Sequence, residues 1–322
     1  MLKNVLGAYL NSVKERDFDL PFISLLHATG FFDIHFTHGQ VEFGKDFIAK
    51  KVEAGVTIQF SFQSKVGDIN QAEWRNNIMG QMLDSVLSSL SHPNFDVQIP
   101  HQTVLVITGH LMGNSALSLQ DLNNQIRATY LKRTIELWDR EYIITLLERY
   151  GLDSIHQATA SEFINYGNFY ELYGKGMQGQ LTVREVEKHS RQWLDESLDS
   201  NRRLLCSSLE VNIFNNLLRE KGMLYECIFV YLTNLRTIMY QINLEQDQLR
   251  LNQLHELYIQ VLDKLRNICT NYINDIQTIW VNANKNLVSA THSTADMITY
   301  AVNCTRTVEI AGFLYFLQNE RA

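Results

Sequence analysis

The stretch VTIQFSFQSK (residues 56–65) decides the fold class of the first half of this chain. Its β-branched and aromatic residues favour an extended strand, and toward its end apolar and polar side chains alternate. The later stretch TVLVIT (residues 103–108) is a short apolar run of the kind found in a central strand of a sheet. Residues 71–90, between the two, carry a helical pattern. We therefore predict two strands of a sheet with a helix between them.

The flanking segments extend this unit into a mixed sheet flanked by helices. Residues 2–29 are predicted to be mainly helical, with an interruption near Pro21, because proline suits the first turn of a helix. Further strands are predicted at residues 33–37, 43–50 and 135–138, and further helices at residues 117–130 and 140–150. The predicted order is helix, three strands, helix, strand, helix, strand, helix, which is an α/β fold.

Turn-forming residues become rare along the chain, which suggests two domains. All three prolines lie in the first hundred residues, and ten of the sixteen glycines occur by Gly151. Because LLERYG has the pattern of a helix closed by a C-cap glycine, we place the boundary there and predict domains at residues 1–151 and 152–322.

The second domain is predicted to be an all-α helical bundle. Apolar residues at spacings of three and four predict helices at residues 183–198, 202–221, 224–243 and 249–279. The stretch NYGNFYELYGKGMQGQ (residues 165–180) mixes aromatic residues with glycine. We predict a connector between the domains there, with a functional loop as the alternative.

Composition places the chain among globular proteins with a substantial core. It has 322 residues, of which 45% are hydrophobic and 20% charged. The four cysteines are widely spaced without a CxxC pair, which argues against a thiolate zinc site and a disulfide framework. Charged residues interrupt both the N-terminus and the most apolar window, residues 223–240, so neither a secretory leader nor a membrane span is expected. The sequence predicts a cytoplasmic protein with no membrane partner.

The net charge limits the kinds of partner. The chain carries 28 Lys+Arg against 35 Asp+Glu, a net charge of −7. Proteins that coat nucleic acid nonspecifically are usually basic. A contact with DNA would therefore depend on a local basic patch or on metal ions.

A set of polar residues at the ends of two predicted strands could carry chemistry. Metal-dependent phosphodiester cleavage needs carboxylates around a divalent cation and a lysine near the attacking water. Asp46 belongs to the segment EFGKD that enters one strand, and Gln63 and Lys65 end the next. Residues two apart on a strand point to the same face, and the seventeen positions from Asp46 to Gln63 allow a hairpin. The pattern favours a catalytic site at these three residues.

Each assignment has a simpler alternative. Asp46 could be a solvent-facing strand acid and Lys65 an ordinary strand-end lysine, but their occurrence with Gln63 in register favours the site. Asp19 is either a metal ligand or the N-cap of its helix. Glu42 is better explained as a loop or outer acid than as a direct ligand.

These segments together resemble the PD-(D/E)XK nuclease superfamily, and in particular the Mrr-type restriction endonucleases. FDLPFISLLHATGFFDI is similar to the family's Phe-acid helix and Gly-aromatic turn, EFGKD to its acid-x-Gly-x-Asp segment, and FQSK to its Gln-x-Lys. VLVITGHLMGNSALSLQDLN and IELWDREYIITLLERYG resemble its later strands and helices. The likeness covers roughly residues 15–151, with its parts in the family's order. Three departures are Asp19 in place of the common Glu, the bulky Phe43 and Lys45 around Gly44, and the acidic charge.

The resemblance implies a restriction-endonuclease-like fold and hydrolysis of DNA phosphodiester bonds. Asp46 and Gln63 would hold Mg²⁺, which Mn²⁺ can replace, with Asp19 and Glu42 as further candidate ligands, and Lys65 would activate the attacking water. The family context implies DNA as partner and a role in bacterial restriction or antiphage defence, with room for an additional defence-system subunit.

Two further expectations concern assembly and activity. A homo-oligomer formed through the helical domain is expected, because nucleases that cut both strands often use two active sites. The alternative function is a nuclease-fold binding or assembly module without cleavage activity of its own.

Overall fold

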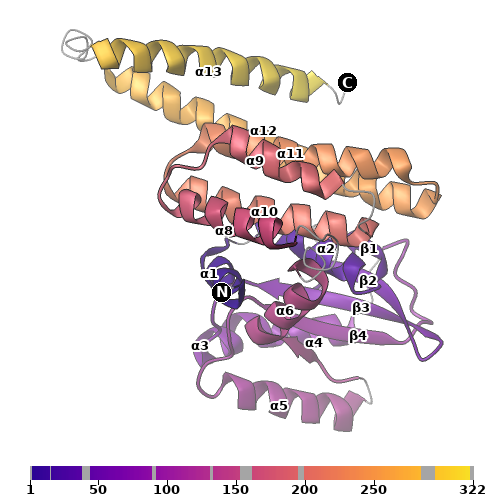
Figure 1. Ribbon diagram of the computed structural model, residues 1–322. Coiled ribbons are helices and arrows are strands. Elements are labelled where there is room, and N and C mark those ends of the chain that lie inside the picture. Colours follow the sequence, from indigo (N-terminus) through magenta and orange to yellow (C-terminus); the bar gives the residue numbers. More distant parts are fainter. Residues whose placement is uncertain are drawn as a thin grey trace. The chain divides into compact units, whose positions relative to one another are not determined.

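The computed structural model describes residues 2–14, 16–37, 44–88, 92–130, 133–152, 162–194, 199–283 and 294–319 (Figure 1). The chain forms two compact units. The first unit comprises Met1–Phe163 and Glu196–Asn212, and the second comprises Ile164–Asp195 and Ile213–Ala322. Each unit is described separately below.

The first unit is built on a five-stranded mixed sheet. In spatial order its strands are β1 (Phe32–Phe36), β2 (Phe47–Glu53), β3 (Val56–Lys65), β4 (His101–Ile107) and β5 (Glu136–Trp138). The pairs β1–β2 and β2–β3 are antiparallel, whereas β3–β4 and β4–β5 are parallel. Ala54 and Gly55 turn β2 into β3 with positive φ angles of 48° and 81°, the backbone that a tight hairpin requires. The predicted mixed sheet is confirmed.

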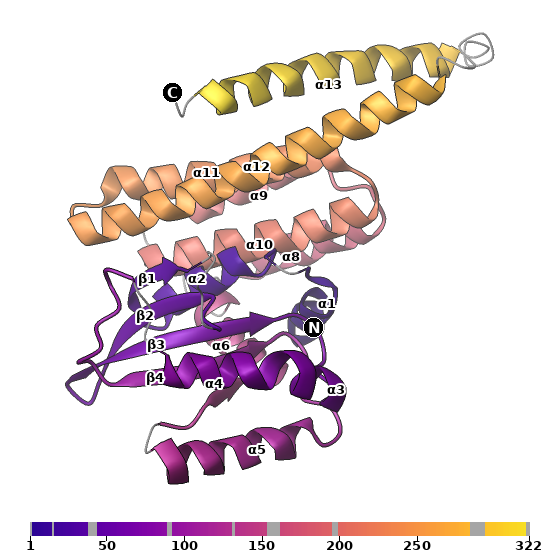
Figure 2. The ribbon, with the colours of Figure 1, turned by 180° about the vertical axis from the view of Figure 1, so that it is seen from behind.

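Helices cover both faces of this sheet (Figures 1 and 2). In chain order they are α1 (Leu2–Ser12), α2 (Asp19–Ala28), α3 (Gln71–Glu73), the π-helical turn η1 (Trp74–Ile78), α4 (Met79–Leu87), α5 (Ser115–Gln125), η2 (Ile126–Tyr130), α6 (Arg140–Leu147) and η3 (Glu148–Leu152). The helices between β3 and β4 and between β4 and β5 provide the crossovers that parallel strands need.

Alternation along β3 gives the sheet two different faces. On the aromatic face of the sheet, β3 carries Phe60 and Phe62. The Phe62 ring packs edge-on against Phe22 of α2 and Trp138 of β5, with a distance of 5.4 Å between ring centroids in each pair. Full burial of a Phe side chain contributes about 1.5–3 kcal/mol, so this cluster fixes α2 on the sheet. Its polar face carries Gln59, Ser61, Gln63 and Lys65.

The helices α4 and α5 cover the polar face. Trp74, Ile78 and Met82 pack with Leu105 and Ile107 of β4 in one buried cluster. Beside this cluster the Ser61 and Ser85 hydroxyls lie 3.0 Å apart, which ties α4 to β3. The polar face is therefore closed by a helix above most of β3.

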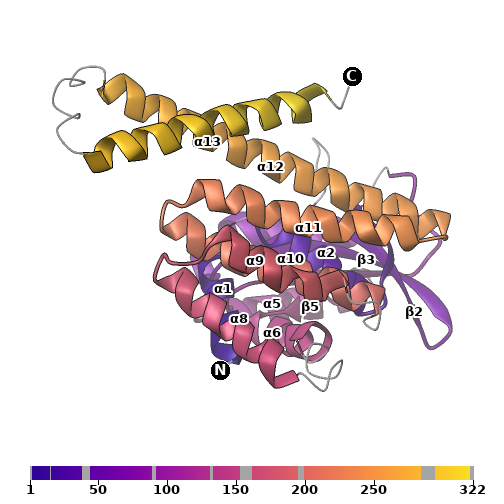
Figure 3. The same ribbon diagram turned by 45° about the horizontal axis from the view of Figure 1, so that its top comes forward.

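The second unit is helical. It contains α8 (Glu162–Met177), α9 (Val183–Ser190), the 3₁₀ turn η4 (Arg191–Leu194), the end of α10 (Ser200–Glu220), α11 (Leu224–Leu244), α12 (Gln248–Ala283) and α13 (Thr294–Asn319). Thr182 and Glu185 form a reciprocal capping box at the start of α9. Figure 3 shows α11, α12 and α13, the longest elements of this unit. The predicted helical second region is confirmed. Among the described residues, no helix combines the length and apolarity needed to cross a membrane.

The predicted connector at residues 165–180 is wrong for most of its length, because α8 runs to Met177. Phe169, Leu172 and Gly176 lie three and four residues apart and share one face, with Phe169 and Leu172 buried. A side chain at Gly176 would come within 2.9 Å of Leu217. The glycine that suggested a turn is therefore a close-packing position inside a helix.

Candidate functional site

The backbone around Asp46 sets the geometry of the candidate site. The Asp46 N–H donates to the Phe62 carbonyl at 2.8 Å, and the Asp46 carbonyl accepts from the Thr37 N–H at 3.0 Å. Because Phe47 pairs with Phe62, Asp46 lies opposite Gln63 at the start of β2. The two segments that the sequence pattern joined are neighbours in the sheet.

The side chains of Asp46 and Gln63 are in direct contact. Gln63 Nε2 donates to Asp46 Oδ2 at 2.8 Å, and the Ser64 N–H donates to the same oxygen at 2.7 Å. Gln63 is only 4% exposed, whereas Asp46 is half-buried. The carboxylate is thus held in one orientation at the border between the interior and the solvent.

Lys65 follows two residues after Gln63 and shares the polar face. The Thr108 N–H donates to the Lys65 carbonyl at 3.1 Å, which fixes the end of β3 beside the end of β4. The Lys65 side chain is half-buried and has no ion pair or hydrogen bond within the described part of the chain. Its ammonium group is therefore available to an anion.

The loop before Asp46 is anchored to α4. Gly44 has a φ of 66°, and a Cβ there would lie 2.1 Å from the carbonyl oxygen of Gln81. Lys45 is fully buried, and its Nζ donates to the Ser88 carbonyl at 2.9 Å, just after the end of α4. Lys45, one of the two bulky residues that distinguish this loop from a glycine-rich one, thus makes a buried contact directly before Asp46.

Burial also changes the titration of Lys45. Removal of the ammonium from water lowers the pKa of Lys45 to about 8, although the Asp84 carboxylate acts in the opposite direction. No local pattern predicts this buried charge, because a lysine beside a strand acid usually faces solvent.

The other two predicted site residues are Asp19 and Glu42. The helix α2 begins at Asp19 and its N-cap is Phe18, so Asp19 lies in the first turn and is not the cap. Phe22 of this helix packs against the aromatic face, the opposite side of the sheet from the Gln63 side chain. Glu42 lies outside the described residues. The structure thus brings Asp46 and Gln63 into contact, and it places Lys65 two residues after Gln63 on the same strand.

The donor atoms at this site fit a hard cation such as Mg²⁺. Gln63 Oε1 is buried and has no hydrogen-bond partner in the described structure. An unsatisfied buried oxygen costs about 1–3 kcal/mol, which an oxygen-seeking cation beside the Asp46 carboxylate would relieve. No group of three or more His, Cys, Asp or Glu side chains capable of holding a metal occurs among the described residues. Mg²⁺ commonly uses only one or two carboxylates together with waters, so this donor set is sufficient.

Another polar cluster on the first unit was not predicted as a functional site. The Asp33 carboxylate accepts from Lys50 Nζ at 2.6 Å and Asn94 Nδ2 at 2.9 Å, and lies 2.7 Å from His35 Nε2. Burial of Asp33 would raise the pKa of this carboxyl, but the His35 and Lys50 contacts lower it well below its usual range. Asp33 has a φ of 50°, so the β1 backbone is strained where this carboxylate is presented.

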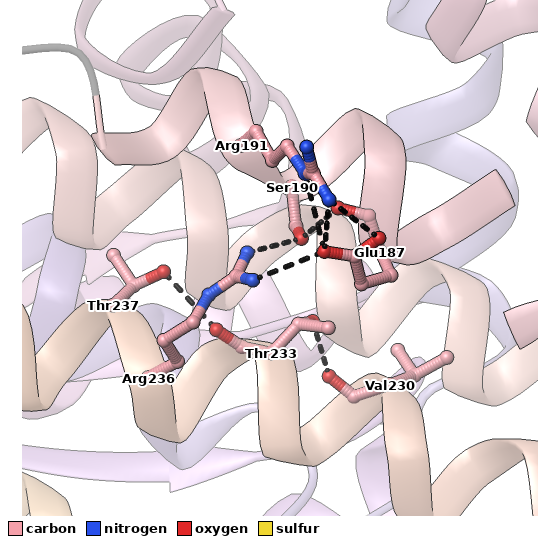
Figure 4. A network of polar contacts seen from close by, with 7 residues as sticks. All are labelled: Glu187, Ser190, Arg191, Val230, Thr233, Arg236 and Thr237. Atoms are coloured by element: carbon pink, nitrogen blue, oxygen red, sulfur yellow. Dashed lines mark hydrogen bonds and ion pairs between the residues drawn. The ribbon is translucent and has the colours of Figure 1, made fainter. Parts of the chain in front are cut away.

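The second unit has its own polar network, at the contact of α9 and α11 (Figure 4). Arg236 Nη2 donates to Ser190 Oγ at 2.7 Å, and Arg236 Nη1 lies 3.4 Å from Glu187 Oε1. Arg191 binds the same glutamate at 3.1 Å. These pairs stabilise the contact between α9 and α11 within one unit, and packing alone explains them.

Comparisons of the chain with protein-family models, with curated proteins and with solved structures find no match.

Proposed function

We propose that the chain is a metal-dependent DNA endonuclease of the PD-(D/E)XK type, similar to the Mrr-type restriction enzymes. One observation carries the proposal: Asp46 and Gln63 touch through their side chains, and Lys65 follows on the same face. The sheet supports it, because a helix, three antiparallel strands, a crossover helix and a parallel strand form the order expected of a restriction-endonuclease-like core. The context in restriction or antiphage defence comes from the resemblance alone.

Each residue has a role that follows from its position. Asp46 and the amide oxygen of Gln63 would hold Mg²⁺ or Mn²⁺, with Asp19 and Glu42 as further candidates. Bound there, the cation would supply polarisation of the scissile phosphate and a lower pKa for the attacking water. Lys65 would donate a hydrogen bond that orients this water, and its charge would stabilise the negative charge that develops on the phosphate. Lys45 and Gly44 anchor the loop before Asp46 to α4 and to Ser88 directly after it.

A second candidate is a binding or assembly module without cleavage activity. The net charge of −7 favours it, because an acidic protein gains little affinity from DNA phosphates. The joint presence of Asp46, Gln63 and Lys65 favours the enzyme, since a module that only binds has no need of all three.

Cleavage of supercoiled plasmid separates the two candidates. The parent, Asp46→Asn and Lys65→Met would be compared in Mg²⁺, Mn²⁺ and EDTA, with Glu53→Gln as the matched control, since Glu53 is an exposed carboxylate on the same strand as Phe47. The nuclease proposal expects metal-dependent cutting by the parent and the control, and a loss of at least about a hundredfold in both site variants.

Two results would count against the enzyme. Equal cutting by parent and Asp46→Asn would indicate a contaminating nuclease or another site. No cutting by the folded parent in either metal, together with measurable DNA binding, would favour the assembly module.

A further inference from the structure

Two glutamine side chains near Asp46 each bury an amide oxygen that has no partner within the described structure. These oxygens are Gln63 Oε1 of β3 and Gln81 Oε1 of α4, and the whole Gln63 side chain is almost completely buried. A buried carbonyl oxygen is normally hydrogen-bonded, because its removal from water is costly. Two such oxygens on neighbouring elements therefore indicate a group that the protein alone does not supply.

The helix α4 places Gln81 above Gln63. It lies along the sheet (Figure 2), and it runs antiparallel to β3 because it belongs to the crossover from β3 to the parallel strand β4. The Ser61 and Ser85 hydroxyls, 3.0 Å apart, fix one point of contact between the strand and the helix. Four residues back along a helix cover about 6 Å and two residues onward along a strand about 7 Å, so Gln81 and Gln63 are the next facing pair.

The loop before Asp46 gives independent evidence that Gln81 lies at the candidate site. A Cβ at Gly44 would lie 2.1 Å from the Gln81 carbonyl oxygen, so the backbones of these two residues are in close contact. Asp46 follows two residues after Gly44, and its Oδ2 accepts from Gln63 Nε2 at 2.8 Å. The carboxylate and the two unpaired amide oxygens therefore belong to one region between β3 and α4.

The charges of this region suit a cation. A hard divalent cation binds carboxylate and amide oxygens together with water, and Asp46 supplies the carboxylate. The buried Lys45 Nζ donates to the Ser88 carbonyl at 2.9 Å. Because Ser88 follows Gln81 by seven positions, about 10 Å along a helix, this ammonium is held away from Gln81. A water molecule alone would satisfy both amide oxygens but would not need the carboxylate.

We infer that Gln81 is a further oxygen donor to the divalent cation held by Asp46 and Gln63, an inference that rests on the metal site of the proposed function. Gln81 belongs to α4, whereas Asp46 and Gln63 belong to the sheet. The bound cation would therefore stabilise the contact between the helix and the sheet, and its binding would raise the melting temperature of the first unit.

Titration with Mn²⁺ in the absence of DNA tests this inference. Electron paramagnetic resonance measures the free ion for the parent, Gln81→Met, Asp46→Asn and the control Gln120→Met, which changes an exposed glutamine of α5. The parent and the control should bind Mn²⁺ with equal affinity, and both site variants should bind it at least about tenfold more weakly. Gln81→Glu should bind Mn²⁺ more tightly than the parent, because it adds a carboxylate to the site.

Thermal unfolding separates a lost ligand from a damaged fold. In EDTA, Gln81→Met should melt at the temperature of the parent or above it, because the substitution removes an unpaired buried oxygen. In Mn²⁺, the melting temperature of the parent should rise more than that of Gln81→Met.

The outcomes distinguish this inference from the nuclease proposal. Equal Mn²⁺ affinity of the parent and Gln81→Met, with weaker binding by Asp46→Asn, overturns the inference and leaves the proposed metal site intact. A parent that binds no Mn²⁺, or binding that is equal in all variants, overturns both. A melting temperature of Gln81→Met that is lowered equally in EDTA and in Mn²⁺ assigns Gln81 to packing and overturns the inference. The expected pattern in a parent that cuts no DNA supports Gln81 as a ligand and overturns only the nuclease.

Discussion

Lys45 lies inside the protein directly before Asp46, and its titration is measurable in the stability of the fold. Below about pH 8 this lysine is charged in both the folded and the unfolded chain, so the cost of burying the ammonium is fully present. As the pH rises from about 8 toward 10.5, the folded state releases its proton first and the cost disappears. The first unit should therefore gain stability on mild alkalinisation.

We predict that Lys45→Met removes this gain. Between about pH 7 and about pH 10 the free energy of unfolding of the parent should rise relative to the variant by on the order of 2 kcal/mol. Urea unfolding at a series of pH values measures the difference. Lys14→Met, which changes an exposed lysine, is the control and should follow the parent. An equal change with pH in the free energy of unfolding of the parent and of Lys45→Met would contradict the prediction.

The Asp33 cluster should show the opposite pH dependence. The lowered pKa of Asp33 means that its carboxylate stabilises the fold above the pKa of the unfolded chain, near 4, and that this contribution is lost as the pH falls. Asparagine tolerates the positive φ found at Asp33, so Asp33→Asn removes the charge without a backbone penalty.

We predict that Asp33→Asn lowers the free energy of unfolding by about 2–3 kcal/mol at neutral pH, because Lys50 is left without its ion partner. The difference from the parent should shrink below about pH 4. Urea unfolding of the parent and the variant at neutral pH and below about pH 4 provides the test. An equal difference in the free energy of unfolding at the two pH values would refute the role assigned to this carboxylate.

At the level of elements, the two glycines near the end of α8 give a matched pair. A Cβ at Gly174 would meet nothing within 4 Å, whereas one at Gly176 would come within 2.9 Å of the Leu217 side chain. Both substitutions improve helix propensity, but only the second adds a steric conflict.

We predict that Gly174→Ala raises the free energy of unfolding by about 0.5–1 kcal/mol, whereas Gly176→Ala leaves it unchanged or lowers it. Thermal unfolding of the two single variants measures the contrast. If residues 165–180 formed a loose connector, neither substitution would change the melting temperature.

Some elements could be predicted closely from the sequence and others could not. The strand β3 matches its prediction at both ends, because β-branched and aromatic residues recur from Val56 to Phe62 and the polar residues that follow continue the alternation. The strand β2 runs to Glu53, past the predicted end at residue 50, because the polar residues Lys51 and Glu53 pair with β3 up to the hairpin. The helix α8 was missed because the packing of Gly176 against Leu217 has no signal in the local sequence.

At the level of the whole molecule, the candidate site depends on long-range pairing that periodicity could anticipate only in part. Alternation along β3 is sufficient to put Gln63 and Lys65 on one face, and a hairpin is sufficient to bring Asp46 opposite Gln63. Burial of Lys45 depends on its contact just after α4, which no local pattern predicts, and no local pattern indicates the unsatisfied oxygen of Gln63. The roles of these residues in cleavage, and the division into domains at Gly151, stay predictions.

The parallel pairing of β3 with β4 has a consequence for the order of events during synthesis. Thirty-five residues separate Lys65 from His101, so β3 leaves the ribosome well before its second neighbour exists. At about 5–20 residues per second, roughly 2–8 seconds pass between the synthesis of β3 and that of β4. During this time the edge of β3 that will pair with β4 is unpaired. That side carries the amide and carbonyl groups of VTIQFSFQSK, a β-prone sequence with a single charge. The nascent chain is therefore most open to strand pairing with other molecules during this interval, and shielding of β3 by a chaperone should raise the yield of folded protein.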